Sequence, residues 1–326
     1  MNQPEWPPTE PRMLQQLTCI VPVYNEAENL LQFIPQLISE CMKFTQKLDI
    51  IVVDDGSRDN TLMVLKQLQQ RYAFKVLVFS RNFGKEAALT AGLSHVDPKS
   101  DATLLIDADF QHPLSCIEQF IQEWQNGCEM VYGVRLHRKD RPVLLRMLST
   151  FFYKLIDRIT PIEIPHDAGD FRLLDRDVVA ALNQLTERER FMKGLYAWVG
   201  FSKKAIGYLP EERTQGQSSW GFKKLIELAI TGITSFSNLP LRMWSVIGAI
   251  ISSLSLLYAL LIILDTLVNG VDLPGYATIT VAITFLGGIQ LLSIGILGEY
   301  IARIFTEVKQ RPPYIISDIL TSRDEN

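Results

Sequence analysis

Cysteine is scarce in this sequence, and its spacing excludes two common uses. The chain of 326 residues has four cysteines, and no two of them form a C-x-x-C pair. They are Cys19, Cys41, Cys116 and Cys128. Most lie in apolar runs, so they are predicted to be buried thiols in a reducing compartment rather than a disulfide framework or a zinc site. His112 and His166 also lack the partner spacing of a zinc site and are interpreted as structural.

The sequence also lacks a positive charge excess, a secretory signal and two nucleotide-binding loops. The net charge is −4, which argues against a nucleic-acid-binding protein. The start, MNQPEWPPTEPRM, has neither the basic nor the apolar region of a signal peptide. No G-x-G-x-x-G follows the first predicted strand, and no G-x-x-x-x-G-K-[ST] occurs. A dinucleotide cofactor and a P-loop ATPase are therefore not expected.

Charge is missing from two long apolar runs near the C-terminus. Residues 245–264 and 275–298 contain no Asp, Glu, Lys, Arg or His, and each is long enough to cross a bilayer, which takes about 20 apolar residues. A pair of buried core helices is the less favoured alternative. The connection between them has no Lys or Arg, whereas Arg242, Arg303, Lys309 and Arg311 flank the pair. The positive-inside rule then places both ends in the cytoplasm.

The resulting prediction is a two-span protein of the inner (cytoplasmic) membrane, with its catalytic domain and both termini in the cytoplasm. The spans cover about 243–267 and 275–301 within a hairpin of residues 241–304. An N-terminal tail covers 1–16 and a cytoplasmic tail 305–326. Residues 142–159 and 222–240 carry apolar faces with basic edges, which is typical of interfacial helices. Gly287, Gly288, Gly295 and Gly298 would permit close helix packing in a homo-oligomer.

Apolar strands alternate with helical patterns in the first two hundred residues. Strands are predicted at 17–24, 48–55, 75–80, 102–107 and 129–134, with helices at 25–42, 60–72 and 85–96 between the first four. Continuous apolar strands between helices indicate an α/β fold with a mostly parallel sheet covered on both faces. Ligands bind such sheets beyond the carboxyl ends of the strands.

Polar residues follow four of these strands. The stretch LLIDADFQHP places Asp107 and Asp109 at the end of the fourth strand, and Asp54 and Asp55 end the second. One acidic turn could merely cap a helix, but several converging turns favour a binding site. Two carboxylates on one turn can hold a divalent cation such as Mg²⁺ or Mn²⁺ against substrate phosphates.

The order of the motifs along the chain makes the prediction of fold and function more specific. IVPVYNEAENL, IIVVDDGSRDNT, SRNFGKEAAL and DADFQHP, followed by HDAGDFRLLDRDVV and the two apolar runs, resemble the family 2 glycosyltransferases of GT-A fold. The sequence is most similar to the polyprenyl-phosphate glycosyltransferases, which include dolichyl-phosphate mannose synthase and bactoprenol glucosyltransferases. It departs from them at Ser219 and Pro210, where the family often has cations. The resemblance implies a GT-A catalytic domain at 17–221.

The implied activity is inverting transfer of a hexose from a nucleotide sugar to membrane polyprenyl phosphate, with glucose from UDP-glucose as the first choice. GDP-mannose and a non-catalytic nucleotide-sugar-binding protein are the alternatives. The expected partners are the nucleotide sugar, the lipid phosphate and the bilayer, with Mg²⁺ or Mn²⁺ as cofactor and no nucleic acid.

The resemblance and the residues together assign candidate roles. The donor-binding candidates are Pro22, Tyr24, Glu26, Asp54, Asp55, Arg81, Lys85 and Asp107. The metal candidates are Asp107, Asp109 and Gln111; the catalytic candidates are Asp157, Asp170 and Arg213. The acceptor phosphate is assigned to Arg135, Arg138, Arg141 and Ser218. Alternatives stay open, since Asp157 could simply pair with Lys154 or Arg158, the basic run could be a solvated surface, and Arg81 could brace its loop.

Overall fold

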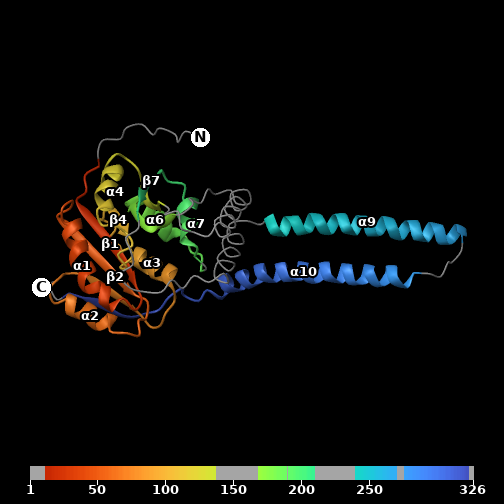
Figure 1. Ribbon diagram of the computed structural model, residues 1–326, viewed down its shortest axis with the longest axis horizontal. Helices are drawn as coiled ribbons and strands as arrows, with labels where there is room; N and C mark the ends of the chain where they lie inside the picture. Colours follow the sequence, from red (N-terminus) through yellow and green to blue (C-terminus); the bar gives the residue numbers. More distant parts are fainter. Residues whose placement is uncertain (1–11, 137–167, 189, 210–238, 270–274, 323–326) are drawn as a thin grey trace.

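The computed structural model describes residues 12–136, 168–188, 190–209, 239–269 and 275–322. The described chain forms an α/β domain from which two long helices project on the same side (Figure 1). The predicted interfacial segments at 142–159 and 222–240 lie outside the described residues, apart from the last two of the second segment.

Four parallel strands form the centre of the sheet. They are β1 (Gln16–Val23), β2 (Lys47–Asp54), β3 (Lys75–Phe79) and β4 (Ala102–Leu105). β1 pairs with β2 on one side, from Gln16↔Lys47 to Val23↔Asp54, and with β4 on the other. β3 pairs with β2. The predicted strands are confirmed here because their apolar runs are buried on both faces, as in a covered parallel sheet.

The sheet has eight strands in the order β7-β5-β6-β4-β1-β2-β3-β8. β5 (Met130–Arg135) matches the fifth predicted strand, and β7 (Lys203–Tyr208) runs parallel to it. β6 (Ala168–Asp175) lies between β4 and β5 and is antiparallel to both. β8 (Ile316–Thr321) pairs antiparallel with β3 at the opposite edge. The strands β6, β7 and β8 were not predicted from the sequence, and β8 lies in the segment assigned to a cytoplasmic tail.

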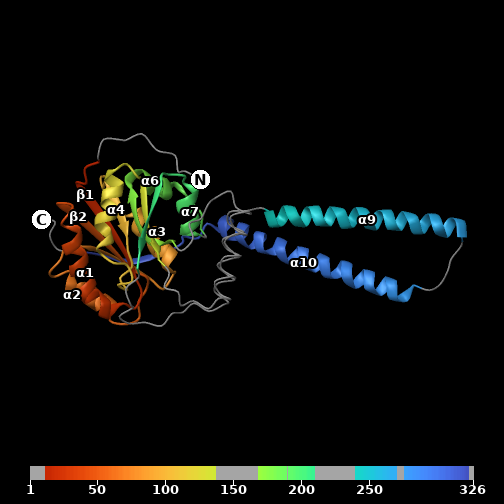
Figure 2. The same cartoon turned by 45° about the horizontal axis from the view of Figure 1, so that its top comes forward.

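Helices cover the two faces of the sheet in two groups (Figures 1 and 2). One face packs against α1 (Ala27–Cys41), α2 (Thr61–Leu68) and α4 (Cys116–Gln125). The other face packs against α3 (Lys85–Ser94), α6 (Arg176–Gln184) and α7 (Met192–Trp198). Alternate residues of β1 point to opposite cores, with Cys19 in the first and Ile20 in the second. The predicted helix across Pro35 is confirmed.

The two projecting helices are α9 (Leu239–Asn269) and α10 (Tyr276–Lys309). Within the described residues, one segment, Phe285–Lys309 of α10, is long and apolar enough to cross a membrane by length and composition. The count of two spans and their orientation stay predictions. A Cβ added at any of the four glycines of α10 would meet no other atom within 4 Å, so the predicted role of these glycines in oligomer packing stays untested.

Candidate functional site

The acidic residues gather at the carboxyl edge of the parallel strands, as their positions in the sequence predict. Asp54 is the last residue of β2 and pairs in register with Val23 at the end of β1. The amide of Asp55 donates to the carbonyl oxygen of Val23 at 2.9 Å. Asp107 and Asp109 follow β4, whose chain continues alongside β1 through the hydrogen bond from the amide of Ile106 to the carbonyl of Ile20. The parallel pairing thus places both acidic pairs at one edge of the sheet.

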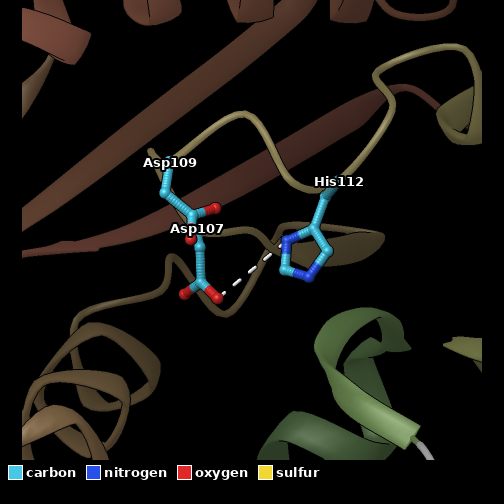
Figure 3. Close-up of side chains that lie close together, drawn as sticks. All are labelled: Asp107, Asp109 and His112. Carbon is cyan, nitrogen blue, oxygen red and sulfur yellow. Dashed lines mark ion pairs between the residues drawn. The ribbon is translucent and has the colours of Figure 1, made fainter. Parts of the chain in front are cut away.

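Three side chains of the β4 loop offer ligand atoms to a cation (Figure 3). One ligand atom each from Asp107, Asp109 and His112 lie within 4.8 Å of one another. Phe110 has a φ of 59°, a left-handed conformation that turns the loop back between the two aspartates and His112. The backbone amide of Gln111 donates to Asp109 Oδ1 at 3.1 Å. The predicted role of the Gln111 side chain as a metal ligand stays a prediction.

His112 has a position that the sequence did not indicate. Its ring stacks on Phe171 with centroids 4.8 Å apart, and its Nδ1 lies 4.0 Å from Asp107 Oδ2. Burial lowers its pKa, an effect that the negative charge of Asp107 partly opposes, so the neutral imidazole is favoured. Both ring nitrogens are buried without a hydrogen-bond partner among the described residues. A neutral imidazole in this position can ligate a cation, so His112 becomes a candidate ligand, and its interpretation as structural stays untested.

Lys85, the first residue of α3, links two candidate carboxylates. Its Nζ lies 2.7 Å from Asp107 Oδ1 and 2.9 Å from Asp170 Oδ2. Burial favours the neutral amine, but the charges of Asp107 and Asp170 outweigh it and raise the pKa of Lys85 above its ordinary value. Lys85 therefore stays cationic and holds the β4 loop against β6. The structure thus brings together the predicted donor residue Lys85 and the predicted catalytic residue Asp170.

Asp170 is at the centre of a partly buried charged cluster. Burial opposes its ionisation, but the charges of Lys85, Lys193 and Arg172 lower its pKa to about 2. Its Oδ1 is buried with no hydrogen-bond partner among the described residues. Arg172, two residues along β6, packs its guanidinium over Tyr196 at 4.2 Å from the ring centroid. The carboxylate is thus ionised and has a free acceptor atom within the described structure.

Glu86 is a further acidic residue of this cluster, and its role could not be predicted from the sequence. Burial and the negative charge of Asp170 raise its pKa to about 7. Its carboxylate accepts a hydrogen bond from the amide of Met192 at 3.0 Å, which joins the N-termini of α3 and α7. Lys193 follows Met192, and burial lowers its pKa although Asp170 opposes the shift. In the sequence Glu86 and Lys193 resemble ordinary surface charges of two helices that are far apart.

Asp54 and Asp55 brace the loops around the site. Asp55 accepts hydrogen bonds from the amides of Phe83 and Gly84 at 2.6 and 2.9 Å, and Asp54 accepts one from the amide of Ser57 at 3.1 Å. Burial raises the pKa of both carboxyls, and these amide hydrogen bonds act in the opposite direction. Both residues therefore have a structural role, and their predicted contact with the donor stays a prediction.

The remaining described candidates surround this edge. Pro22 lies within β1, and the Tyr24 side chain after it is exposed. Glu26 accepts a hydrogen bond from Asn29 in the first turn of α1. Arg81 stacks over Phe83, 4.0 Å from the ring centroid, and donates to the carbonyl of Asn82. These contacts lie within its own loop, and both the bracing role and the phosphate contact of Arg81 stay predictions.

The predicted acceptor region is described only in part. Arg135 donates through Nε to the hydroxyl of Tyr208 at 3.2 Å. The other acceptor and catalytic candidates lie outside the described residues. These are Arg138, Arg141, Asp157, Arg213 and Ser218.

The structure combines a mostly parallel α/β sheet, whose acidic edge could hold a cation, with a helical hairpin. These features place the chain in the class of α/β domains that have a candidate ligand site at the carboxyl edge of the sheet and a helical extension. The model described as "Glycosyl transferase family 2" matches residues 18–182, and that described as "GtrB C-terminal hairpin" matches residues 239–304. The chain therefore belongs to glycosyl transferase family 2, and the family resemblance seen in the sequence is confirmed.

Several relatives match nearly the whole chain. An uncharacterized glycosyltransferase of Synechocystis is 45% identical and covers 94% of this chain and 96% of its own length. A prophage-derived bactoprenol glucosyl transferase of Shigella flexneri is 43% identical, covering 92% of this chain and 97% of that protein. Among solved structures, a mannosyltransferase from Pyrobaculum calidifontis in complex with GDP-Man and Mn²⁺ is similar over 94% of this chain and 91% of that chain, with 14% identity and a TM-score of 0.46.

Proposed function

We propose that this protein transfers a hexose from a nucleotide sugar to a polyprenyl phosphate at the membrane. The observation that carries the proposal is the edge cluster of Asp107, Asp109 and His112, held against Asp170 by Lys85. Family membership supports glycosyl transfer, and relatives named bactoprenol glucosyl transferase support the lipid acceptor. The apolar α10 segment supports a site close to lipid.

Asp107 and Asp109 would hold a divalent cation, with His112 or Gln111 completing the protein ligands. The donor set fits, because Mg²⁺ and Mn²⁺ accept carboxylate oxygens and Mn²⁺ also accepts imidazole. When bound, such a cation neutralises the charge that develops on the leaving pyrophosphate. Lys85 adds a fixed positive charge next to Asp107, and the ionised Asp170 that it contacts is proposed to lie at the sugar pocket. Asp54, Asp55 and the turn with Pro22, Tyr24 and Glu26 would enclose the nucleotide.

The reaction needs little proton transfer at the acceptor. A phosphomonoester has a second pKa near 6, so its oxygen is already largely ionised at neutral pH. In an inverting displacement that oxygen bonds to the anomeric carbon while the bond from this carbon to the nucleoside diphosphate breaks. Cationic side chains must hold the two anionic groups together. Arg135, Arg138, Arg141 and Arg213 with Ser218 are proposed for this role, and Asp157 for orienting the acceptor.

Glucose from UDP-glucose is the proposed donor, because relatives over nearly the whole chain are named glucosyl transferases. GDP-mannose is the second choice, and a non-catalytic nucleotide-sugar-binding protein is the alternative from another class. We further propose two membrane spans in the hairpin with the catalytic domain in the cytoplasm, where residues 222–240 would lie at the membrane surface.

A donor screen with purified full-length protein tests this proposal. The protein is mixed with Mg²⁺ or Mn²⁺, a short polyprenyl phosphate and one of UDP-glucose, GDP-mannose or an N-acetylated donor. We expect turnover with UDP-glucose, and a loss of roughly 10²–10³-fold in Asp109→Asn, the range for removing one group that stabilises developing charge. Glu118→Gln on the exposed face of α4 is the control and should retain activity. Full activity of Asp109→Asn, or in excess chelator, would contradict the metal site.

A further inference from the structure

The chain that follows α10 returns to the α/β domain. There it lies beside residues 80–84, the candidate donor loop. We call residues 310–321 the C-terminal strap. The strap begins at Gln310, whose left-handed φ of 50° ends α10, and finishes as β8 along β3. Its first part is anchored by Arg188, which donates from its backbone to Glu307 Oε1 and from its side chain to the carbonyl of Arg311. The apolar helix is thus joined to the edge of the sheet by a short, anchored segment.

Tyr314 is the strap residue that reaches toward the site. Its ring stacks on Phe79, the last residue of β3, with centroids 5.2 Å apart and planes 6° apart. Its hydroxyl lies 2.9 Å from the hydroxyl of Ser94 at the end of α3. The next residue, Ile315, accepts a hydrogen bond from the amide of Ser80 at 3.0 Å. The strap therefore holds the exit of β3 and the C-terminus of α3 at once.

The contact continues from Phe79 into the donor loop through aromatic rings. Phe79 meets Phe83 edge to face, with centroids 5.7 Å apart, and the Arg81 guanidinium lies over Phe83 at 4.0 Å. The amide of Phe83 donates to Asp55. Lys85, two residues on, binds Asp107 and Asp170. One series of contacts thus runs from the strap to residues of the candidate donor and metal sites.

We propose that Tyr314 is a positioning residue for the nucleotide site and that the strap couples α10 to the loop of residues 80–84. The ring of Tyr314 fixes Phe79, Phe79 fixes Phe83, and Phe83 sets the place of Arg81 and of the amides that hold Asp55. This inference rests on the proposed function for the identity of the nucleotide, but the coupling of strap to loop does not. It also predicts that the acidic motifs alone do not make a complete donor site when the residues after the hairpin are removed.

The test compares Tyr314→Ala, Tyr314→Phe and wild type as full-length proteins in detergent. Ile319→Ala, on the exposed side of β8, is the matched control. Amide hydrogen exchange is measured for residues 80–84, and affinity is measured for UDP and for GDP in the presence of Mn²⁺. Tyr314→Phe keeps the ring stack on Phe79 and loses the hydroxyl contact with Ser94. It therefore separates the effect of the ring from that of the hydroxyl. Where Tyr314→Ala lowers the melting temperature strongly, Tyr314→Leu provides a milder variant that still removes the ring stack on Phe79.

We expect faster exchange at residues 80–84 in Tyr314→Ala and nucleotide binding weaker by roughly three- to tenfold, the factor expected for losing one aromatic pair. The KM for the donor should rise while the KM for the lipid acceptor stays unchanged. Tyr314→Phe and Ile319→Ala should behave like wild type. Unchanged exchange at residues 80–84 in Tyr314→Ala would overturn the coupling, and unchanged nucleotide affinity despite faster exchange would overturn the positioning role. Failure of wild type to bind either nucleotide would count against the proposed function, and the exchange data would then decide the coupling alone.

Discussion

Some residues of the site can be identified from the sequence, and others are brought to the site only by the fold. Asp107 and Asp109 follow an apolar strand directly, so their place at the sheet edge could be predicted. Glu86 and Lys193 lie on α3 and α7, which meet because both helices pack on one face of the sheet. No local pattern signals that meeting. His112 lacks zinc-type spacing in the sequence, but that spacing is not required where carboxylates supply the other ligands.

The raised pKa of Glu86 has a consequence for stability. In the folded protein burial and the charge of Asp170 raise this pKa to about 7, from an ordinary value of 4.5. Between these two values the folded state keeps a proton that the unfolded state releases, so the contribution of Glu86 to stability falls as the pH rises through this window. Above about pH 7 the loss is complete.

Glu86→Gln removes this titration and keeps an oxygen that can accept from the amide of Met192. We therefore expect the melting temperature of the variant to fall less than that of wild type between pH 5 and pH 7.5. Thermal unfolding of both purified proteins across this range is the measurement. Parallel pH profiles would mean that Glu86 ionises normally in the folded protein.

At the scale of elements, the first five strands and the helices between the first four could be predicted, whereas β6, β7 and β8 could not. The strands β1 to β5 have long apolar runs bounded by polar turns, and their predicted boundaries agree with the structure to within two residues. β6 contains Asp170 and Arg172, whose charges interrupt the apolar pattern, although both side chains are accommodated by the charged cluster. β8 has an exposed, mixed sequence and follows a helix of 34 residues. Its pairing with β3 is a long-range contact without a local signal.

The junction of two loops gives a prediction at this scale. Gly56 follows the β2 aspartates with a φ of +66°, and an added Cβ would lie 2.4 Å from the backbone carbon of Arg81. Gly200 also has a positive φ, of +75°, but an added Cβ would meet only the carbonyl oxygen of Trp198, at 3.9 Å. Gly56→Ala should therefore lose more stability than the roughly 1–2 kcal/mol that a left-handed alanine costs.

Gly200→Ala is the control, because Gly200 has a φ similar to that of Gly56 and an added Cβ there would cause no collision. Melting temperatures of the two variants in the full-length protein make the comparison. Equal losses would show that the loops after β2 and β3 can move apart freely, against the close approach seen in the structure.

At the scale of the whole molecule, the hairpin and the domain are connected at both ends of the helical pair. The chain leaves the catalytic domain before α9 and re-enters it after α10 through β8, and both helices project away from the sheet (Figures 1 and 2). The sheet and the apolar segment of α10 are therefore linked through β8.

The most direct test of the account is the chemical identity of the lipid product. Purified full-length protein is incubated with ¹³C-labelled UDP-glucose, Mn²⁺ and a short polyprenyl phosphate, and the lipid fraction is analysed by mass spectrometry and NMR. The account predicts a lipid that has gained one labelled hexose on its retained phosphate, with the anomeric configuration inverted relative to the donor. Labelled glucose found only free in water, or a lipid without the hexose–phosphate bond, would contradict it.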